Sequence, residues 1–500
     1  MNILSFIKSK SIWIICVLSF LAAFTYNEIN LNNLPKERIR DNQTVITNDD
    51  YSYLYPPQHY IEHGIWSEGS AREQARYFRP PGYGMIYYVL LKTVGSEFSL
   101  LFLKLLQLIL FSFSVYWFYS ILLSLIKNKK IALIGAVIYG LSPFAIGFLY
   151  FTLTEGVTPN LLLLYVFLLF KAYEANLAKA KNIFYLSASL IFAFIFITRP
   201  VLGVFSLLLP IFLIKDYWKV SITHALIKLI VLGSTAFSLM AIWQIRNYNI
   251  SSEYVGLNPI YDTEQVSMYR PPFKAYWEFS GGWAEKGYVT LSVMDPFWIA
   301  AIHEDTSQFY IDNILKTYPN HVTEYFGKER LINVFRKYQT VIINQSLAFK
   351  NHTLLPKEMP PLEKELVKEI EQLTSDYKSE FWFKYHITSP IKVFSTMAFH
   401  SNLSLYIFQQ TFRGNILMEI TRVVFFGLHS LCFVGLLLSL FFFRNSDWRM
   451  LGITLALLIY VFYLAYFQRG LEERYTLPIL PLLLIGLVTL LNQLKNLLRR

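Results

Sequence analysis

Residues 49–84 read DDYSYLYPPQHYIEHGIWSEGSAREQARYFRPPGYG, and this stretch decides how the rest of the chain is interpreted. It follows the first apolar run and places paired acids, many aromatic residues, two Pro-Pro pairs and four glycines in one polar segment. Arginine binds phosphate in a bidentate manner, and a carboxylate can act as a general base. Acids and arginines together beside a membrane are therefore the residue types expected at a site for a phosphorylated ligand.

The composition indicates a membrane protein with several spans. The chain has 500 residues, of which 54% are hydrophobic and 17% aromatic, and its mean hydropathy is +0.38. A soluble domain exposes too much surface to carry this apolar fraction. The net charge of +11 is explained by basic residues at the cytoplasmic ends of spans, so it does not require a nucleic-acid partner. Cys16 and Cys432 lie inside apolar runs, which excludes a disulfide framework.

Ten apolar runs are long enough to be candidate spans across a hydrocarbon core of roughly 30 Å. They cover residues 11–27, 98–126, 131–150, 156–172, 183–198, 200–214, 225–245, 416–443, 450–467 and 476–494. If the spans alternate, the lysine- and arginine-rich connections all fall on one side, which the positive-inside rule makes cytoplasmic. Both termini are then expected in the cytoplasm, with the first span uncleaved.

Two large segments fall on the opposite, extracytoplasmic side. We predict an N-terminal transmembrane module over residues 1–246 with a catalytic first outer loop at 28–97, an extracytoplasmic segment at 247–415, and C-terminal spans at 416–500. Within the second outer segment, Leu362, Leu366, Ile370 and Leu373 recur at helical spacing. They predict an amphipathic helix, which we expect to pack on the membrane domain.

Charged residues gather at the outer ends of the predicted spans. They are Asp49, Asp50, Arg79, Glu155, Arg199, Arg246, Glu472, Glu473 and Arg474. Charges at membrane depth are costly, so they usually mark a function or pair with one another. Each one alone could simply extend to the interface or cap a helix. Their common level favours a site for an anionic ligand.

The motifs around these charges resemble the GT-C-type integral membrane glycosyltransferases, in the branch of protein mannosyltransferase-like and aminoarabinose transferase-like enzymes. Asp49-Asp50-Tyr51-Ser52-Tyr53 and Arg79-Pro80-Pro81-Gly82-Tyr83 are similar to the first outer loop of that family. Glu155 resembles its second-loop acid. Further motifs that resemble the family are Thr198-Arg199-Pro200, Trp243-x-x-Arg246-Asn247-Tyr248 and Glu473-Arg474-Tyr475. Residues 251–415 match no motif of the family, and Gly84 stands where the family often has proline.

The resemblance implies an all-α GT-C-like bundle of about ten spans, with Asp49 as catalytic base and Asp50 as its neighbour. It also implies a substrate-binding set, which is Tyr53, Arg79, Glu155, Arg199, Arg246, Glu473, Arg474 and Tyr475. The expected donor is a polyprenyl-phosphate-linked sugar, and the acceptor is a hydroxyl of a glycan, lipid or protein. The expected location is the plasma (inner) membrane, with the site facing away from the cytoplasm.

Two questions stay open at this stage. No cofactor is certain, although Asp49, Asp50 and Glu155 could offer oxygen ligands to a divalent cation. The rival class is a transporter or flippase of lipid-linked glycans, which would also carry charges at membrane depth. Transporters tend to place their site near the midplane, often between repeated halves. In this chain the charges lie at one face of the membrane, and the two halves of the chain differ in design. Both features favour the enzyme.

Overall fold

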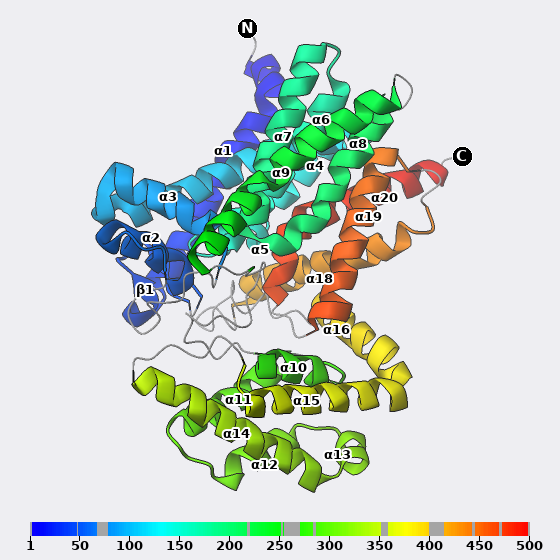
Figure 1. The fold of residues 1–500 in the computed structure, drawn as a ribbon. Helices are drawn as coiled ribbons and strands as arrows, with labels where there is room; N and C mark the ends of the chain where they lie inside the picture. The colour runs from blue at the N-terminus through cyan, green and yellow to red at the C-terminus, as the bar shows by residue number, and fades with distance from the viewer. Residues whose placement is uncertain are drawn as a thin grey trace.

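The computed structural model describes residues 3–47, 49–67, 79–217, 221–251, 254, 271–283, 287–351, 359–399, 415–442, 446–469 and 473–498. Within these ranges the chain is an all-α polytopic membrane protein, as predicted, with one two-stranded hairpin made of β1 (Ile39–Arg40) and β2 (Thr44–Val45). A bundle of long helices carries both termini at its upper end in Figure 1, and a module of shorter helices lies below it.

The first half of the bundle contains the helices that precede the module. They are α1 (Ile3–Asn32), η1 (Lys36–Arg38), α2 (Tyr51–His63), α3 (Gly82–Ile126), α4 (Lys129–Gly140), α5 (Pro143–Ile146), η3 (Thr154–Gly156), α6 (Thr158–Glu174), α7 (Ala178–Thr198), η4 (Pro200–Leu207), α8 (Leu208–Tyr217) and α9 (Ile222–Ser251). The rest of the bundle is formed by α18 (Ile416–Leu438), α19 (Trp448–Tyr463), η8 (Leu464–Gln468), η9 (Glu473–Ile479) and α20 (Leu480–Leu497).

Eight helices among the described residues are long and apolar enough to cross a membrane. They match eight of the ten predicted runs. The other two runs correspond to shorter helices: α4 has 12 residues and ends at Gly140, before Ser142-Pro143 breaks the helix, and α6 has 17. A span needs about 17–25 residues, so α6 is at the lower limit and α4 is below it. Eight described helices thus qualify as candidate spans by length and composition, against ten predicted runs.

The outer loop predicted over residues 28–97 contains more helix than expected. Helix α1 continues to Asn32, and α3 already begins at Gly82. Gly95 interrupts α3 with φ of 79°, a left-handed backbone conformation that favours glycine. The second part of α3 therefore matches the predicted span at 98–126, and its first part belongs to the predicted loop.

The basic connections meet at one end of the bundle. Lys181 pairs with Asp216 at 2.6 Å, and Lys228 donates to the Tyr217 hydroxyl at 2.9 Å. Arg449 at the start of α19 reaches Ser124 of α3 at 2.7 Å and Glu174 of α6 at 3.5 Å. These contacts join helix ends that the positive-inside rule assigned to one side, so the described basic ends do share one end of the fold.

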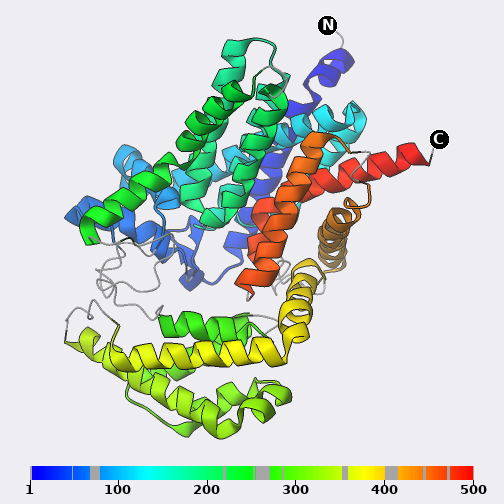
Figure 2. The same ribbon diagram turned by 45° about the vertical axis from the view of Figure 1, so that its right-hand side comes forward.

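The lower module has its own hydrophobic core. Its helices are α10 (Pro271–Ser280), α11 (Gly287–Ile302), α12 (Gln308–Lys316), α13 (Asn320–Phe326), α14 (Lys328–Lys350) and α15 (Pro361–Glu380). Figure 2 shows α15 (yellow) running through the module below the bundle, with the green α10 above it. The amphipathic helix predicted around residues 362–373 is α15, with Leu366, Ile370 and Leu373 buried. The prediction that it packs on the membrane domain is wrong, because these side chains belong to the module's own core, where α15 meets α10 and α14.

The module joins the bundle through η5 (Lys384–Thr388), α16 (Ser389–Phe399) and the end of η8. Arg469 donates to the Gly281 carbonyl at 3.2 Å, and the Trp277 indole donates to the Gln468 carbonyl at 3.1 Å. The His386 ring and the Tyr466 hydroxyl are 2.6 Å apart. We call these six residues the junction. It fixes the module close to the segment that carries Arg474.

Candidate active site

The site forms at the end of the bundle opposite the basic connections, where Asp49 precedes α2. The Arg79 guanidinium donates to Asp49 Oδ1 at 2.6 Å and to the Tyr53 hydroxyl at 2.8 Å. The Arg474 guanidinium, 425 residues further along the chain, donates to Asp49 Oδ2. Asp49 and Tyr53 thus share one arginine. Asp49 keeps 28% of its side chain exposed.

A second carboxylate lies deeper in the same cluster. Glu155 in η3 pairs with Arg199, which ends α7, at 2.8 Å, and its Oε1 lies 3.8 Å from Nε of Arg474. Its side chain is only 4% exposed. The Arg199 guanidinium also lies 4.7 Å from the centre of the Tyr475 ring. Arg474 therefore links the partly exposed acid to the buried one, and three arginines surround two carboxylates.

Local backbone features bring these residues together. Gly82, three residues after Arg79, packs so closely on Thr198 that a Cβ atom there would clash with the Thr198 backbone. This approach places the start of α3 beside the end of α7, and so Arg79 near Arg199. Gln107 of α3 donates to the Leu149 carbonyl at 2.8 Å and accepts from the Tyr83 hydroxyl at 3.2 Å. These bonds hold the segment before Glu155 against α3.

The arginines set the charge state of both acids. Burial by itself raises the pKa of the Asp49 carboxyl, but Arg79 and Arg474 outweigh burial and hold that pKa below the ordinary aspartate value. Burial opposes ionisation of Glu155 in the same way, and Arg199 and Arg474 reverse the effect and lower its pKa. Both acids are therefore carboxylates at neutral pH.

Asp50 points to a different set of partners. Its Oδ2 accepts from Arg40 at 3.0 Å and from the Thr152 hydroxyl at 3.3 Å, and its side chain is 1% exposed. It occupies the N-cap position of α2 but makes no side-chain cap bond. The Asp50 side chain therefore does not cap α2. The carboxylate instead ties the β1–β2 hairpin to the segment before η3.

The remaining predicted residues have different places. Arg246 in α9 donates to the Trp66 carbonyl at 3.2 Å and lies 4.5 Å from the Trp243 ring centre. The Tyr475 carbonyl accepts from the Tyr460 hydroxyl at 2.8 Å. Glu473 begins η9, and its side chain lies outside the described part of the structure, as does Glu472.

Two residues near the site were not predicted. Arg40 pairs with Asp50, and Thr154 accepts from Arg199 at 2.9 Å. Arg40 was visible as a charge in the first outer loop. No periodicity or motif signals its pairing, because the contact depends on how the hairpin folds back on α2. Thr154 was visible only as the neighbour of Glu155.

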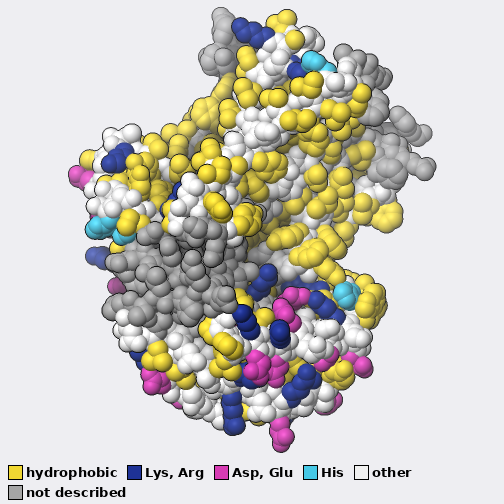
Figure 3. Space-filling view, viewed as in Figure 1, with side chains coloured by type: hydrophobic (Ala, Val, Ile, Leu, Met, Phe, Trp, Pro, Cys, Tyr) yellow, Lys and Arg dark blue, Asp and Glu magenta, His cyan; other side chains and the backbone are white. Residues whose placement is uncertain are grey.

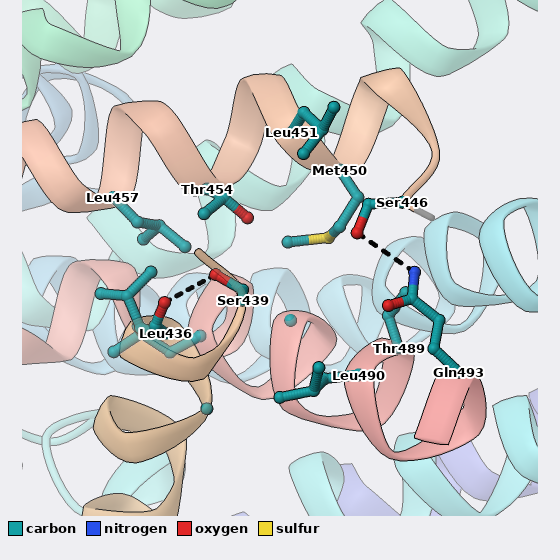
Figure 4. A pocket seen from close by; sticks show the side chains of 13 residues that line it. Leu436, Ser439, Ser446, Met450, Leu451, Thr454, Leu457, Thr489, Leu490 and Gln493 are labelled. Atoms are coloured by element: carbon teal, nitrogen blue, oxygen red, sulfur yellow. Dashed lines mark hydrogen bonds between the residues drawn. The ribbon is translucent and has the colours of Figure 1, made fainter. Parts of the chain in front are cut away.

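An apolar cavity adjoins Glu155. It is lined mainly by Tyr139, Phe144, Phe148, Leu477 and Leu480, with Glu155 as its charged member. A second pocket lies between α18, α19 and α20 (Figure 4). Ser446, Met450 and Gln493 line it near the basic end of the bundle, and none of its lining residues is charged. Of these two pockets in the described part of the chain, the one beside Glu155 borders the charged cluster.

The three acids that could offer ligands to a divalent cation are engaged by arginines in this arrangement. Each of Asp49, Asp50 and Glu155 already pairs with a guanidinium, and a cation would have to compete with these positive charges. Within the residues that the structure describes, no group of three or more histidine, cysteine, aspartate or glutamate side chains could hold a metal. The divalent cation stays an untested prediction.

Comparisons with known proteins give a remote likeness in structure. No protein-family model matches the chain, and no curated protein matches it. Among solved structures, ArnT from Cupriavidus metallidurans bound to undecaprenyl phosphate is similar with a TM-score of 0.36 and 10% identity, covering 95% of this chain and 77% of that chain. The same protein in its apo state gives a TM-score of 0.35 and 10% identity over 97% of this chain and 78% of that chain.

Proposed function

We propose that this protein is a glycosyltransferase that moves a sugar from a polyprenyl-phosphate-linked donor to an acceptor hydroxyl, on the side of the membrane away from the cytoplasm. The observation that carries this proposal is the cluster of Arg79, Arg199 and Arg474 around Asp49 and Glu155. It lies at the end of the spans, beside an apolar cavity. A charged phosphate and an apolar tail need these two environments next to each other.

The reaction needs a base and a site for the leaving phosphate. Asp49 takes the proton of the acceptor hydroxyl, and the hydroxyl oxygen forms a bond to the anomeric carbon. The bond from that carbon to the phosphate oxygen breaks, and the lipid phosphate leaves with the electron pair. Guanidinium groups of Arg79 and Arg474 stabilise the charge that develops on the phosphate. Atoms and charge balance without a further reactant.

The resting contacts of Asp49 suggest how donor binding prepares the base. Both of its oxygens accept from arginines, which keeps the carboxylate ionised but weakly basic. A donor phosphate competes for the same guanidinium groups. As the arginines turn to the phosphate, Asp49 loses positive neighbours and gains an anionic one, so its basicity rises. The base is then strongest when the donor is present.

The proposal is tested by incubating purified protein with a panel of polyprenyl-phosphate sugars and measuring release of the lipid phosphate. Arg79→Ala and Arg474→Ala should weaken donor use strongly, and Arg→Lys should restore it only in part, because lysine lacks the planar bidentate fork. Arg330→Ala is a control, since that arginine pairs with Asp376 in the lower module. Normal donor affinity in both Arg79→Ala and Arg474→Ala would remove the phosphate role.

We infer the orientation in the membrane from the shared basic end, by the positive-inside rule. We expect a cysteine introduced as Pro360→Cys to react with an impermeant maleimide in intact cells, and Asn128→Cys to react only after permeabilisation. Ser70→Cys, in the first outer loop, should behave like Pro360→Cys. Native Cys16 and Cys432 are buried and give little background. Labelling at 128 without labelling at 360 would place the site on the cytoplasmic side.

The rival transporter class is less consistent with this geometry. The charged cluster lies where helices begin or end, at Arg199 after α7 and Arg474 at the start of η9. A transporter usually holds its site near the midplane on broken helices. Product formation in the assay above separates the two classes directly, because a transporter releases no lipid phosphate.

A further inference from the structure

An exposed apolar ridge runs along the segment that joins the module to the bundle. Phe383, Ile387 and Ile391 are spaced four residues apart, with exposed fractions of 64%, 36% and 61%. Trp382 beside them is 57% exposed. We call these four residues the ridge. Large apolar side chains in a contiguous exposed patch usually mark an interaction surface.

The opposite face of the same segment is well packed. Tyr385 is 5% exposed and belongs to the module's core, whereas Val393 is 3% exposed. The Ser389 hydroxyl, 3% exposed, donates to the Gly281 carbonyl at 2.9 Å. The segment is therefore folded onto the protein by one face. The ridge is the face that remains, and its exposure is not caused by a poorly packed helix.

The ridge continues a surface that must already face lipid. Helix α16 packs on the span α18: the Ser430 hydroxyl donates to the Ala398 carbonyl at 2.8 Å, and the rings of Phe394 and Phe433 lie 6.0 Å apart. The free face of α18 is apolar, with Ile420 55% and Val423 61% exposed. Figure 3 shows hydrophobic side chains over the bundle and again at the right-hand edge of the module, where η5 and α16 lie.

Basic residues flank the ridge. Lys384 and Lys392 are both exposed, and Lys384 lies 4.9 Å from the Phe381 ring centre. Tryptophan and phenylalanine with neighbouring lysines are the composition of segments that lie in the interface of a bilayer, where lysines meet anionic headgroups. Much of the rest of the module's visible surface carries mixed acids and bases (Figure 3). The charge and composition of the ridge and its flanking lysines therefore favour an anionic lipid surface as the partner.

We propose that residues 382–392 rest in the surface of the bilayer on the side where the module lies. The ridge enters the boundary between headgroups and acyl chains, and Lys384 and Lys392 lie at the level of lipid phosphates. The occupant of this face is an anionic lipid surface rather than a protein. This contact holds the module at a fixed height over the end of the bundle, whichever reaction the charged cluster performs.

The ridge is connected to the charged cluster through the junction. His386 lies between Phe383 and Ile387 and contacts the Tyr466 hydroxyl at 2.6 Å. Arg469 donates to the Tyr466 carbonyl at 2.6 Å and stands 3.9 Å over the Tyr385 ring. Arg474 follows five residues later. Lipid contact at the ridge thus reaches the segment that carries Arg474 through a short series of packed side chains.

The test uses full-length protein in nanodiscs, with Cys16→Ala and Cys432→Ala as background and an environment-sensitive fluorophore on one new cysteine. Phe383→Cys and Ile391→Cys report on the ridge. Phe309→Cys is the matched control, because Phe309 is 61% exposed in α12 of the same module. We expect the two ridge probes to emit at shorter wavelength, to be quenched by nitroxide-labelled lipid, and to be several-fold less quenched by iodide than the control.

Lipid composition separates the remaining explanations. Nanodiscs that contain phosphatidylglycerol should protect the ridge probes more than phosphatidylcholine alone, and Lys384→Glu with Lys392→Glu should remove that difference. Ridge probes that behave like the Phe309→Cys probe would overturn the proposal. Protection of the ridge probes from iodide without quenching by nitroxide-labelled lipid would also overturn it, because the ridge would then be covered by protein, either this chain or a second copy.

Discussion

Asp49→Asn is expected to lower the turnover of sugar transfer by about a hundredfold to ten-thousandfold while the protein still folds and inserts. Asparagine has nearly the same shape as aspartate and can accept from Arg79 or Arg474 through its carbonyl oxygen. It cannot take a proton from the acceptor hydroxyl. The loss should therefore appear in kcat, measured as lipid phosphate released per enzyme, with the fold intact.

The stability cost of the same change is much smaller. Asp49 is 28% exposed, and ion pairs of partly exposed side chains contribute about 1 kcal/mol or less. A hundredfold to ten-thousandfold loss of rate corresponds to about 3–5 kcal/mol of barrier. The effect of losing a structural role on stability is therefore smaller than the effect of losing a catalytic role on the reaction barrier. A variant that folds normally and transfers sugar at the wild-type rate would end the assignment of Asp49 as base.

Two other aspartates serve as controls. Asp216→Asn removes a carboxylate that pairs with Lys181 at 2.6 Å at the basic end of the bundle, so turnover should be unchanged. Asp50→Asn removes a 1% exposed carboxylate held by Arg40, and we expect it to reduce stability more than turnover. A larger loss of turnover in Asp50→Asn than in Asp49→Asn, at equal folded fraction, would exchange the roles of the pair.

The pH dependence of the reaction rate tests the role of Asp49 independently. In the free protein the pKa of Asp49 is held below the ordinary aspartate value, so the acid limb of kcat/KM should lie below the ordinary aspartate range. If the donor phosphate draws the arginines away, the pKa of Asp49 rises in the complex. The acid limb of kcat should then lie at higher pH than that of kcat/KM. If the acid limbs of kcat and kcat/KM lay at the same pH, the arginines would not move from Asp49 to the donor phosphate.

Glu155→Ala is expected to destabilise the protein by about 3–5 kcal/mol, because it leaves the Arg199 guanidinium buried without its carboxylate. The side chains of Glu155 and Arg199 are 4% and 7% exposed, and their charged atoms are 2.8 Å apart. Breaking a buried pair by removing one partner costs far more than breaking a surface pair. Unfolding of the purified protein by denaturant or heat measures the loss.

The chain offers a surface pair as the matched control. Glu304 and Lys350 are 2.6 Å apart but 56% and 47% exposed, so Glu304→Ala should leave the unfolding transition unchanged. Replacing both buried partners, as in Glu155→Leu with Arg199→Met, should recover much of the stability but not the activity. If Glu155→Ala unfolded like the wild-type protein, the buried pair would not contribute to stability.

Much of the architecture could be predicted from local sequence. Hydropathy located the eight described helices that can span a membrane, since a span must be long and apolar to cross the hydrocarbon core. The bias of lysine and arginine grouped connections that the fold brings to one end. The spacing of Leu366, Ile370 and Leu373 predicted α15 correctly. Each of these signals lies within one segment, and periodicity along a segment is what a sequence records directly.

The sequence did not show which of these elements pack against one another. The spacing of apolar residues in α15 shows that one face is buried, but not against what, and the prediction of contact with the membrane domain was wrong for that reason. The break after Gly140 shortened α4 because Ser142-Pro143 follows it. The helical start of α3 before Gly95 was likewise missed, because its apolar run is too short to cross a membrane by itself.

The candidate active site shows most clearly which features the sequence determined and which only the structure decided. The sequence by itself determined which residues carry charge at the ends of the spans, because charges in apolar surroundings stand out in composition. Only the tertiary structure decided that Asp49 meets Arg79 and Arg474, that Glu155 meets Arg199, and that Asp50 pairs with Arg40 instead. Asp49 and Arg474 are 425 residues apart, and their contact depends on how α2, α3 and η9 pack. Neighbouring aspartates with the same chemistry acquire different environments because the backbone turns them toward different helices.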